Sequence, residues 1–139
     1  MVAAVPTGYA FNRTRKEFLA TELFIANTHW SRLRGLMASA PGSFRAGQGL
    51  WIVPCRGVHT MAMRFPIDVL YLDRANNVVH LEEDLKPWRF APVRIAAASV
   101  LELPIQTIHR TQTVVGDLID ISLQQPRHSE AACAPALNY

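Results

Sequence analysis

GVHTMAMRFPIDVLYLD, residues 57–73, is the longest stretch of strand-like composition in this sequence of 139 residues. Apolar and β-branched residues recur along it, a pattern typical of strands that bury at least one face. Pro66 cannot donate a hydrogen bond to a sheet. The stretch therefore predicts two strands, over 58–64 and 67–73, with a bend at Pro66 between them.

A hairpin is predicted directly after this stretch. Asn76 and Asn77 tolerate the left-handed backbone conformation that tight hairpin turns require. Residues 78–82 have strand composition and follow the turn at once. We therefore expect 67–73 and 78–82 to pair as antiparallel neighbours.

The rest of the chain adds short strands separated by turn residues. These are predicted over 18–26, 49–53, 98–103 and 118–123, with one short helix after Asn27 and another within 104–112. Such spacing favours a mainly β, compact, antiparallel sandwich-like or barrel-like single domain with one or two short helices. We expect this domain to span residues 18–123. Residues 1–17 are then an N-terminal extension and residues 124–139 a flexible C-terminal tail.

Composition narrows the classes of partner. Half of the residues are hydrophobic and 18% are charged, which suits a globular domain with a sizeable core. The net charge of +3 comes from scattered basic residues without a basic stripe, so no nucleic-acid partner is expected. No window approaches the roughly 20 apolar residues of a membrane helix, so no membrane association is expected. The first residues lack the pattern of a signal peptide, and we expect a cytoplasmic protein.

Cysteine and histidine spacing gives no sign of a metal or cofactor. Cys55 and Cys133 form no metal-type pair, and no metalloprotease, nucleophile-elbow or phosphate-loop motif occurs. Neither a metal nor a cofactor is therefore predicted. The sequence gives no indication of the oligomeric state.

Strand alternation groups the polar residues by face. Asp68 shares a face with Leu70 and Leu72, where a carboxylate needs a partner. Arg32 and Arg64 are the candidate partners. Such a pair fixes the helix to the sheet, or Asp68 is a catalytic or ligand-binding carboxylate; both remain open.

Other polar side chains are candidates for a site. His59 and Thr60 are adjacent in a predicted strand and so point to opposite faces, which argues against a hydroxyl–imidazole pair. His59 shares a face with Met63, which suggests the lining of a pocket. Glu102 faces away from its neighbours Leu101 and Leu103, toward solvent or toward a cavity.

Several short motifs together resemble one protein family. They are RLRGLM (32–37), VHT (58–60), MRFPIDV (63–69), LD (72–73), Leu85, PWR (87–89), VLELP (100–104) and Gly116-Asp117. In this order they resemble the bacterial and archaeal family called domain of unknown function 192, over roughly residues 20–123.

The resemblance implies a compact, mainly β domain and brings no established activity. It also implies that the signature residues come together in space: Arg32, Gly35, Met37, His59, Thr60, Met63, Asp68, Glu102 and Asp117. The family commonly has Ala-Gly after Leu-Pro, where this chain has Ile105-Gln106. If that glycine serves a positive φ, Gln106 costs roughly 1 kcal/mol or the turn has a different shape.

Three functions are compatible with these residues. The first is a β domain that binds a small polar ligand; its candidate residues are Arg32, His59, Thr60, Met63, Asp68, Trp88 and Glu102. The second is a structural or partner-binding domain whose signature residues hold the fold. The third is an acid/base enzyme that uses Glu102, Asp68 or His59, so the sequence leaves open whether the chain is an enzyme.

For the binding domain we expect a specific cavity. His59 and Met63 line one side, Trp88 closes it and Glu102 stands at its rim. Such a cavity suits a sugar or a nucleobase-like ring.

Overall fold

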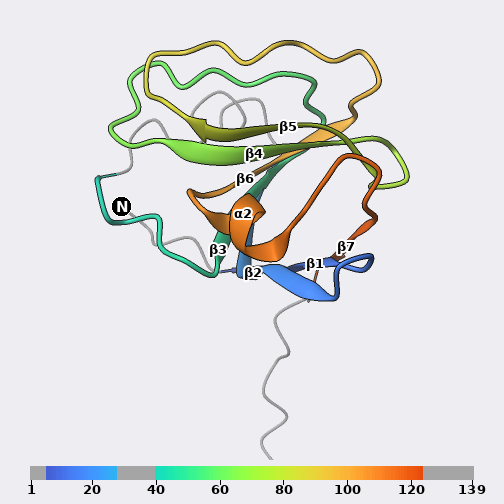
Figure 1. Cartoon of the computed structure of the whole chain (residues 1–139). Helices are drawn as coiled ribbons and strands as arrows, with labels where there is room; N and C mark the ends of the chain where they lie inside the picture. The colour runs from blue at the N-terminus through green and yellow to red at the C-terminus, as the bar shows by residue number, and fades with distance from the viewer. Residues whose placement is uncertain (1–5, 28–39, 124–139) are drawn as a thin grey trace, which may run out of the picture.

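The computed structural model describes residues 6–27 and 40–123 (Figure 1). Within these residues the chain forms one seven-stranded sheet and one short helix of five residues. The elements are β1 (Gly8–Asn12), β2 (Glu17–Ala26), β3 (Gln48–Ile52), β4 (Ile67–Leu72), β5 (Val78–Leu85), β6 (Ser99–Pro104), α2 (Thr107–Thr111) and β7 (Ile119–Leu123). The predicted mainly β fold is confirmed. No helix in these residues is long and apolar enough to cross a bilayer.

The sheet curls into a half-barrel, as the turn of the strands from β5 to β7 shows in Figure 1. The strand order is β5-β4-β6-β3-β2-β1-β7; β2 and β3 are parallel and all other neighbours antiparallel. The two ends of the sheet approach each other where Asn77 and Leu118 form a bridge. Beside it the Ile119 N–H donates to the Asn76 carbonyl oxygen over 2.9 Å.

An inner core fills the curl of the sheet. It joins side chains from β1, β2, β4, β6 and β7, and α2 adds Ile108. Leu23, Leu70 and Leu101 are completely buried in it. Burying each such side chain stabilises the fold by roughly 1.5–3 kcal/mol. The inner core is therefore a large source of stability for the half-barrel.

An outer core covers the other face of the sheet at β4 and β6. Val69, Tyr71 and Val100 pack there against Val58 and Met63. These last two belong to residues 53–66, the first covering loop; residues 86–98 form the second and add Ala91 and Ala97. Every residue of β4 and of β6 is consequently buried.

The predicted hairpin is confirmed, because β4 pairs with β5 in antiparallel register and Asn76 has a φ of 64°. The strand predicted over 58–64 is wrong. These residues run irregularly in the first covering loop, with a bridge between His59 and Phe90 and a φ of 61° at Ala62. Their apolar side chains pack onto the outer face of the sheet, and that packing requires no ladder partner.

The expectation that residues 1–17 form an extension is also wrong, because β1 lies inside the sheet between β2 and β7. Ala10 is fully buried, and a Cβ at Gly8 would stand 1.8 Å from the Ser122 carbonyl oxygen. Turn-forming residues around this short strand hide its pattern in the sequence. The predicted helix after Asn27 and the tail over 124–139 lie outside the described residues.

Candidate functional site

Thr60 fastens the two covering loops to each other. Its hydroxyl donates to the Lys86 carbonyl oxygen over 2.6 Å and accepts the Arg89 N–H over 2.9 Å. The Thr60 carbonyl oxygen also accepts the Trp88 N–H over 2.8 Å. The side chain is completely buried. These internal bonds give Thr60 a structural role in positioning the loops.

Asp68 is a buried carboxylate whose two oxygens are both used by backbone amides. Oδ1 accepts the N–H of Asp84 and Oδ2 the N–H of Ile108, each over 2.9 Å. The second bond satisfies an amide in the first turn of α2, where no intrahelical acceptor exists. Asp68 thus ties β4 to β5 and to the helix.

Arg64, one of the two candidate partners, does not pair with Asp68: it is exposed, and no ion pair joins them among the described residues. Arg32, the other expected partner, lies outside the described residues. Among the described residues the partners of Asp68 are therefore two backbone amides, which the chain brings to the strand from residues 84 and 108.

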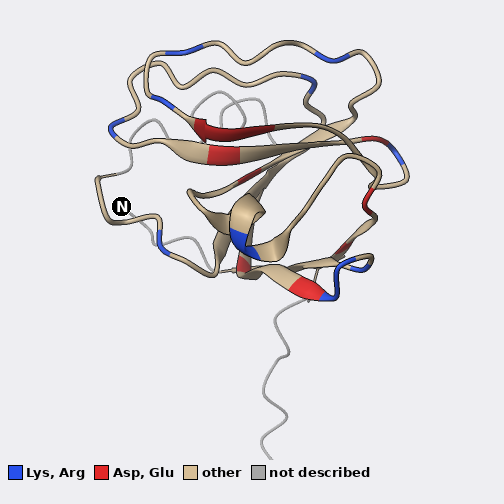
Figure 2. Cartoon of the chain, in the orientation of Figure 1, with Lys and Arg blue, Asp and Glu red and all other residues tan. Residues whose placement is uncertain are grey.

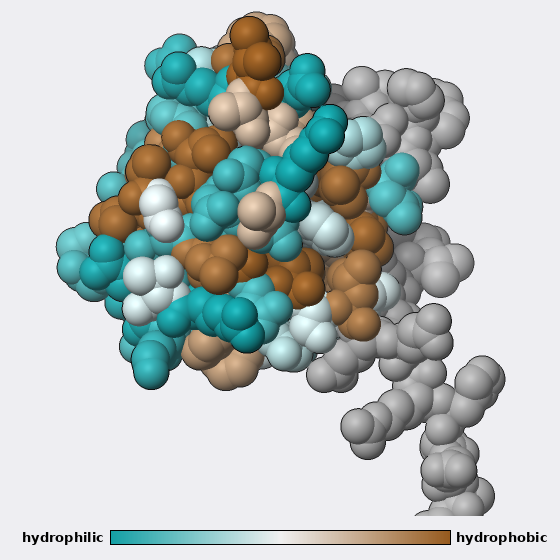
Figure 3. Space-filling view, turned by 90° about the vertical axis from the view of Figure 1, so that its right-hand side faces the viewer, coloured by the Kyte–Doolittle hydropathy of each residue, from teal (hydrophilic) through white to brown (hydrophobic). Residues whose placement is uncertain are grey.

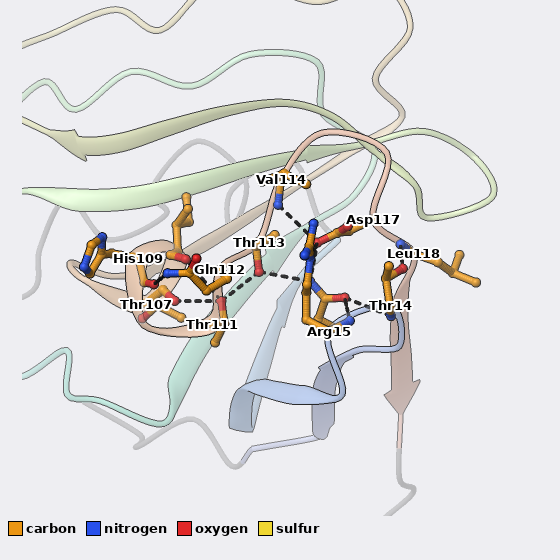
Figure 4. A network of polar contacts seen from close by, with 12 residues as sticks. Thr14, Arg15, Thr107, His109, Thr111, Gln112, Thr113, Val114, Asp117 and Leu118 are labelled. Atoms are coloured by element: carbon orange, nitrogen blue, oxygen red, sulfur yellow. Dashed lines mark hydrogen bonds and ion pairs between the residues drawn. The ribbon is translucent and has the colours of Figure 1, made fainter.

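Asp117 belongs to a polar network at the far end of the inner core (Figure 4). Its Oδ2 accepts from Asn12 Nδ2 over 2.9 Å, from Arg15 Nε over 3.0 Å and from the Val114 N–H over 3.1 Å. Burial raises the pKa of Asp117, but these hydrogen bonds outweigh it and hold the pKa below its ordinary value.

The same network continues into α2. Asn12 Nδ2 also donates to Thr113 Oγ1, which lies 2.7 Å from Thr111 Oγ1. The sequence did not identify Asn12 as part of this network, because no local pattern indicates a hydrogen bond to residues about a hundred positions away. The network is internally satisfied and stabilises the fold.

Glu102 differs from these side chains. It lies on β6 between Leu50 of β3 and Val69 of β4, and both of these belong to the apolar clusters of the outer face. The residue is only 3% exposed, and its buried Oε2 has no hydrogen-bond partner. Burial raises the pKa of Glu102 from 4.5 to about 8. At neutral pH the carboxyl group is therefore mostly protonated.

The predicted direction of Glu102, away from Leu101 and Leu103, is confirmed, because those two residues lie in the inner core. Its expected place at the rim of a cavity is wrong. The residue is only 3% exposed, and an argument from strand alternation cannot foresee that burial.

Tyr71 brings a second unpartnered polar group to the outer face. Its hydroxyl is buried without a hydrogen-bond partner, and burial raises the pKa of Tyr71 to about 12. Tyr71 stands two residues along β4 from Val69, the register partner of Glu102. Such diagonal positions are within reach of long side chains. Tyr71 was not among the predicted site residues, since a tyrosine in an apolar strand reads as ordinary core.

His59, Met63 and Trp88 occupy different environments. Met63 is buried in the outer core. His59 is half-buried, with an unpartnered Nδ1 and its ring 6.3 Å from that of Phe90. Trp88, which was expected to close the cavity, is 60% exposed. His59 and Trp88 nevertheless lie on neighbouring loops, which Thr60 joins.

Two further buried polar atoms lack partners, Trp51 Nε1 and Ser99 Oγ, but they belong to the inner side of the sheet. Their register partners, Leu101 and Leu72, are inner-core residues. Across residues 6–27 and 40–123, no group of three or more His, Cys, Asp or Glu could hold a metal ion. The candidate site is therefore the outer face around Glu102 and Tyr71.

Comparison with known proteins points to one family. The family model DUF192, described as "Uncharacterized ACR", matches residues 10–121. A UPF0127 protein of Thermococcus sibiricus (strain DSM 12597 / MM 739) is 29% identical over 132 residues, covering 91% of this chain and 83% of that protein. A UPF0127 protein of Pyrococcus furiosus is 30% identical over 114 residues, covering 78% of this chain and 94% of that protein.

Two solved structures share the fold. A protein of unknown function from Novosphingobium aromaticivorans DSM 12444 aligns with a TM-score of 0.69 at 17% identity, covering 84% of each chain. A Sinorhizobium meliloti 1021 protein, solved as a candidate transcription regulator, aligns with a TM-score of 0.73 at 17% identity, covering 87% of this chain and 98% of that one. At this identity the likeness concerns the fold alone.

Proposed function

The chain belongs to the DUF192 family, which is described as uncharacterized. We propose that this protein binds a small polar ligand at the outer face of its sheet. Glu102 is the central hydrogen-bonding group of this site, and the Tyr71 hydroxyl is the second. The apolar side chains around them contact the flat or apolar face of the ligand.

The observation that carries this proposal is the unsatisfied carboxyl group of Glu102. Buried polar groups in folded proteins almost always have hydrogen-bond partners. Leaving one unpaired costs roughly 1–3 kcal/mol. Within the described residues Glu102 has no such partner, although Asp68 on the adjacent strand has two. A cost of this kind is typical of a binding or catalytic site, where the missing partner arrives with the ligand.

The protonation state of Glu102 suggests the chemistry of the ligand. With a pKa of about 8 the group is a neutral acid at pH 7, which donates one hydrogen bond and accepts others. A sugar that presents neighbouring hydroxyls, or a nucleobase-like ring that presents a donor beside an acceptor, complements such a group. The flanking Leu50 and Val69 favour a ligand with an apolar face.

The two alternative functions have weaker support at this face. A purely structural role suits Thr60, Asp68 and Asp117, whose hydrogen bonds are all internal. It does not suit Glu102, which makes none among the described residues. An acid/base enzyme needs a second group within reach of the first. Asp68, one candidate for it, is held by two amides.

A thermal-shift screen with monosaccharides and nucleosides tests the proposal, using wild type, Glu102→Leu and the exposed control Glu17→Gln. We expect Glu102→Leu to melt at a higher temperature than wild type without ligand, because it removes an unsatisfied buried carboxyl. We expect the same variant to lose every ligand-induced shift that wild type and Glu17→Gln show. Tyr71→Phe removes only the hydroxyl, which is also buried without a partner, so it should weaken the shifts and raise the unliganded melting temperature as well.

Two results would contradict the proposal. If Glu102→Leu were less stable than wild type without ligand, the carboxyl would have a structural role. If ligands that stabilise wild type stabilised Glu102→Leu equally, they would bind elsewhere on the molecule.

A further inference from the structure

The most exposed large hydrophobic side chains of the described residues gather on the second covering loop. They are Trp88, Phe90, Val93 and Ile95, with 60%, 77%, 70% and 86% of their surface exposed. The next most exposed large hydrophobic residue, Val115, reaches 57% and lies elsewhere. Scattered exposed hydrophobic residues are normal, but a cluster of this kind marks an interaction surface.

Basic residues alternate with this cluster. Lys86, Arg89 and Arg94 are exposed on the same loop, and Arg56 and Arg64 on the first covering loop. Neither loop contains an acidic residue. Figure 2 shows the resulting blue segments along both upper loops, with red on the strands β4 and β5 below. Among the described residues none of the four arginines forms an ion pair, so their charge is available to a partner.

The two loops form one platform. The Ala91 N–H donates to the Val58 carbonyl oxygen and the Arg94 N–H to that of Arg56, each over 2.8 Å. A Cβ at Gly57 would lie 3.0 Å from Val93 Cγ2, so the loops are in close contact there. In Figure 3 the top of the molecule, where these loops lie, shows hydrophobic side chains standing among hydrophilic ones. We define residues 53–66 and 86–98 together as the loop platform.

We propose that the loop platform docks the protein onto the surface of a bilayer that contains anionic phospholipids. Apolar side chains with interleaved basic residues are the composition of interfacial membrane-binding segments. The apolar side chains enter the boundary between the lipid headgroups and the acyl chains, and the arginines contact the lipid phosphates. Lys86 is already paired with Asp84 and is not needed for this contact. The absence of a long apolar run in the sequence does not bear on this mode, because interfacial binding requires none.

A bilayer suits these residues better than a nucleic acid does. Single-stranded nucleic acids are held by basic residues and by aromatic rings on which the bases stack. Ile95 is the most exposed of the four hydrophobic residues and Val93 the third, and neither has a ring. Exposed aliphatic side chains lower their free energy when they leave water for a lipid phase, whereas they offer no ring on which a base could stack.

A hollow beside the platform supports the same partner. It has a volume of about 400 Å³ and is lined by Arg56, Asp73, Arg74 and Ile95, together with Ala75 and Ala96–Ala98. Asp73 Oδ1 already accepts the N–H groups of Ala75 and Asn77, each over 2.9 Å. Among the described residues neither Arg56 nor Arg74 forms an ion pair, so both guanidinium groups remain for an anion. A lipid headgroup phosphate would bind there while Ile95, which lines the hollow and is largely exposed, enters the bilayer.

Co-sedimentation of the whole chain with vesicles tests this proposal. The vesicles are phosphatidylcholine alone or an equimolar mixture of phosphatidylcholine and phosphatidylserine. We expect binding to the mixed vesicles, weakening as salt is added. The double variant Arg89→Gln/Arg94→Gln should weaken it by about thirtyfold, since each basic residue near the surface contributes about one factor of five. The matched control Arg13→Gln/Lys16→Gln removes the same charge far from the platform and should bind as wild type does.

The apolar contribution is tested with Phe90→Ser/Ile95→Ser, matched by Val114→Ser/Val115→Ser, which replaces two exposed hydrophobic residues elsewhere. The platform variant should lose at least about tenfold in binding and the control should lose nothing. Circular dichroism and melting temperature check that each variant folds.

Three results would overturn the proposal. The first is equal binding to both kinds of vesicle, or none. The second is an equal loss in platform and control variants. The third is a Phe90→Ser/Ile95→Ser variant that binds vesicles as well as wild type does and also binds a single-stranded oligonucleotide as well as wild type does. That result would show a general attraction to polyanions.

Discussion

Two buried carboxyl groups lie on neighbouring strands, Asp68 on β4 and Glu102 on β6, and face opposite sides of the sheet. Asp68 is 1% exposed and accepts two backbone N–H groups. Glu102 is 3% exposed and, within the described residues, accepts none. Burial alone therefore does not decide what a carboxyl group does. The supply of donors around it separates a structural residue from a candidate for binding.

The difference arises from what covers each face. On the inner side α2 and β5 present free backbone amides to Asp68. On the outer side Glu102 is flanked by Leu50 and Val69, and the outer core next to them is built of apolar side chains. We infer that the fold uses the first carboxylate and leaves the second to a ligand.

The largest expected effect is the pH dependence caused by Glu102. Burial raises its pKa in the folded protein from 4.5 to about 8, while the unfolded chain ionises near the ordinary value. Between these pH values the folded protein keeps a proton that the unfolded chain has lost. Stability should therefore fall as pH rises through this window, by on the order of 5 kcal/mol, and level off above it.

Urea unfolding at several pH values, from below 4.5 to above 8, measures this slope. Glu102→Gln cannot ionise, so the difference in stability between it and wild type should grow with pH across the window. Glu17→Gln, at an exposed position, should follow wild type. A constant difference between Glu102→Gln and wild type would mean that the pKa of Glu102 is ordinary.

The next largest effect is expected for Asp68→Ala. It leaves the amides of Asp84 and Ile108 without their acceptor, and each unsatisfied buried group costs roughly 1–3 kcal/mol. We expect a loss of about 4 kcal/mol in the free energy of unfolding. Asp68→Asn keeps one acceptor oxygen and should lose about half as much.

Chemical denaturation compares these variants with Asp120→Ala, a half-exposed strand aspartate whose side chain has no hydrogen bond among the described residues. A loss for Asp68→Ala no larger than for Asp120→Ala would mean that the two amide bonds contribute nothing. The contrast with Glu102 would then disappear.

The smallest expected effect is at Gln106, the residue that leads the chain into α2 and so toward Asp68. Gln106 has a φ of 70°, a left-handed conformation that favours glycine. Gln106→Gly should relieve this strain and stabilise the protein by up to about 1 kcal/mol, after the larger backbone entropy of the unfolded glycine chain is subtracted.

Thermal unfolding checks this gain against Gln48→Gly, which places glycine in β3 and should lose about 0.5–1 kcal/mol. If Gln106→Gly also lost stability, the glutamine side chain would have a favourable role at this turn. The entry into α2 would then be held by more than the bond to Asp68.

Several features could be predicted from the sequence because they depend on neighbours along the chain. The β4–β5 hairpin follows from Asn76 and from strand composition on either side of it. The direction of Glu102 follows from alternation with Leu101 and Leu103. The sequence left open whether the turn at Gln106 keeps a positive φ or has a different shape, and the structure has a φ of 70° there.

Other features depended on contacts between distant segments. The first covering loop has the composition of a strand, yet it packs on the sheet without joining it, and β1 joins the sheet despite its turn-like surroundings.

The sequence by itself determined that β4 and β6 are strands, which face of the sheet each of their residues occupies, and that each strand carries a carboxyl group. Only the tertiary structure decided the environment of those groups. The donors to Asp68 come from 16 and 40 residues along the chain. The seclusion of Glu102 depends on packing over the outer face. Local pattern sets the direction of a side chain, but its hydrogen bonds and its pKa depend on groups that folding brings from elsewhere in the chain.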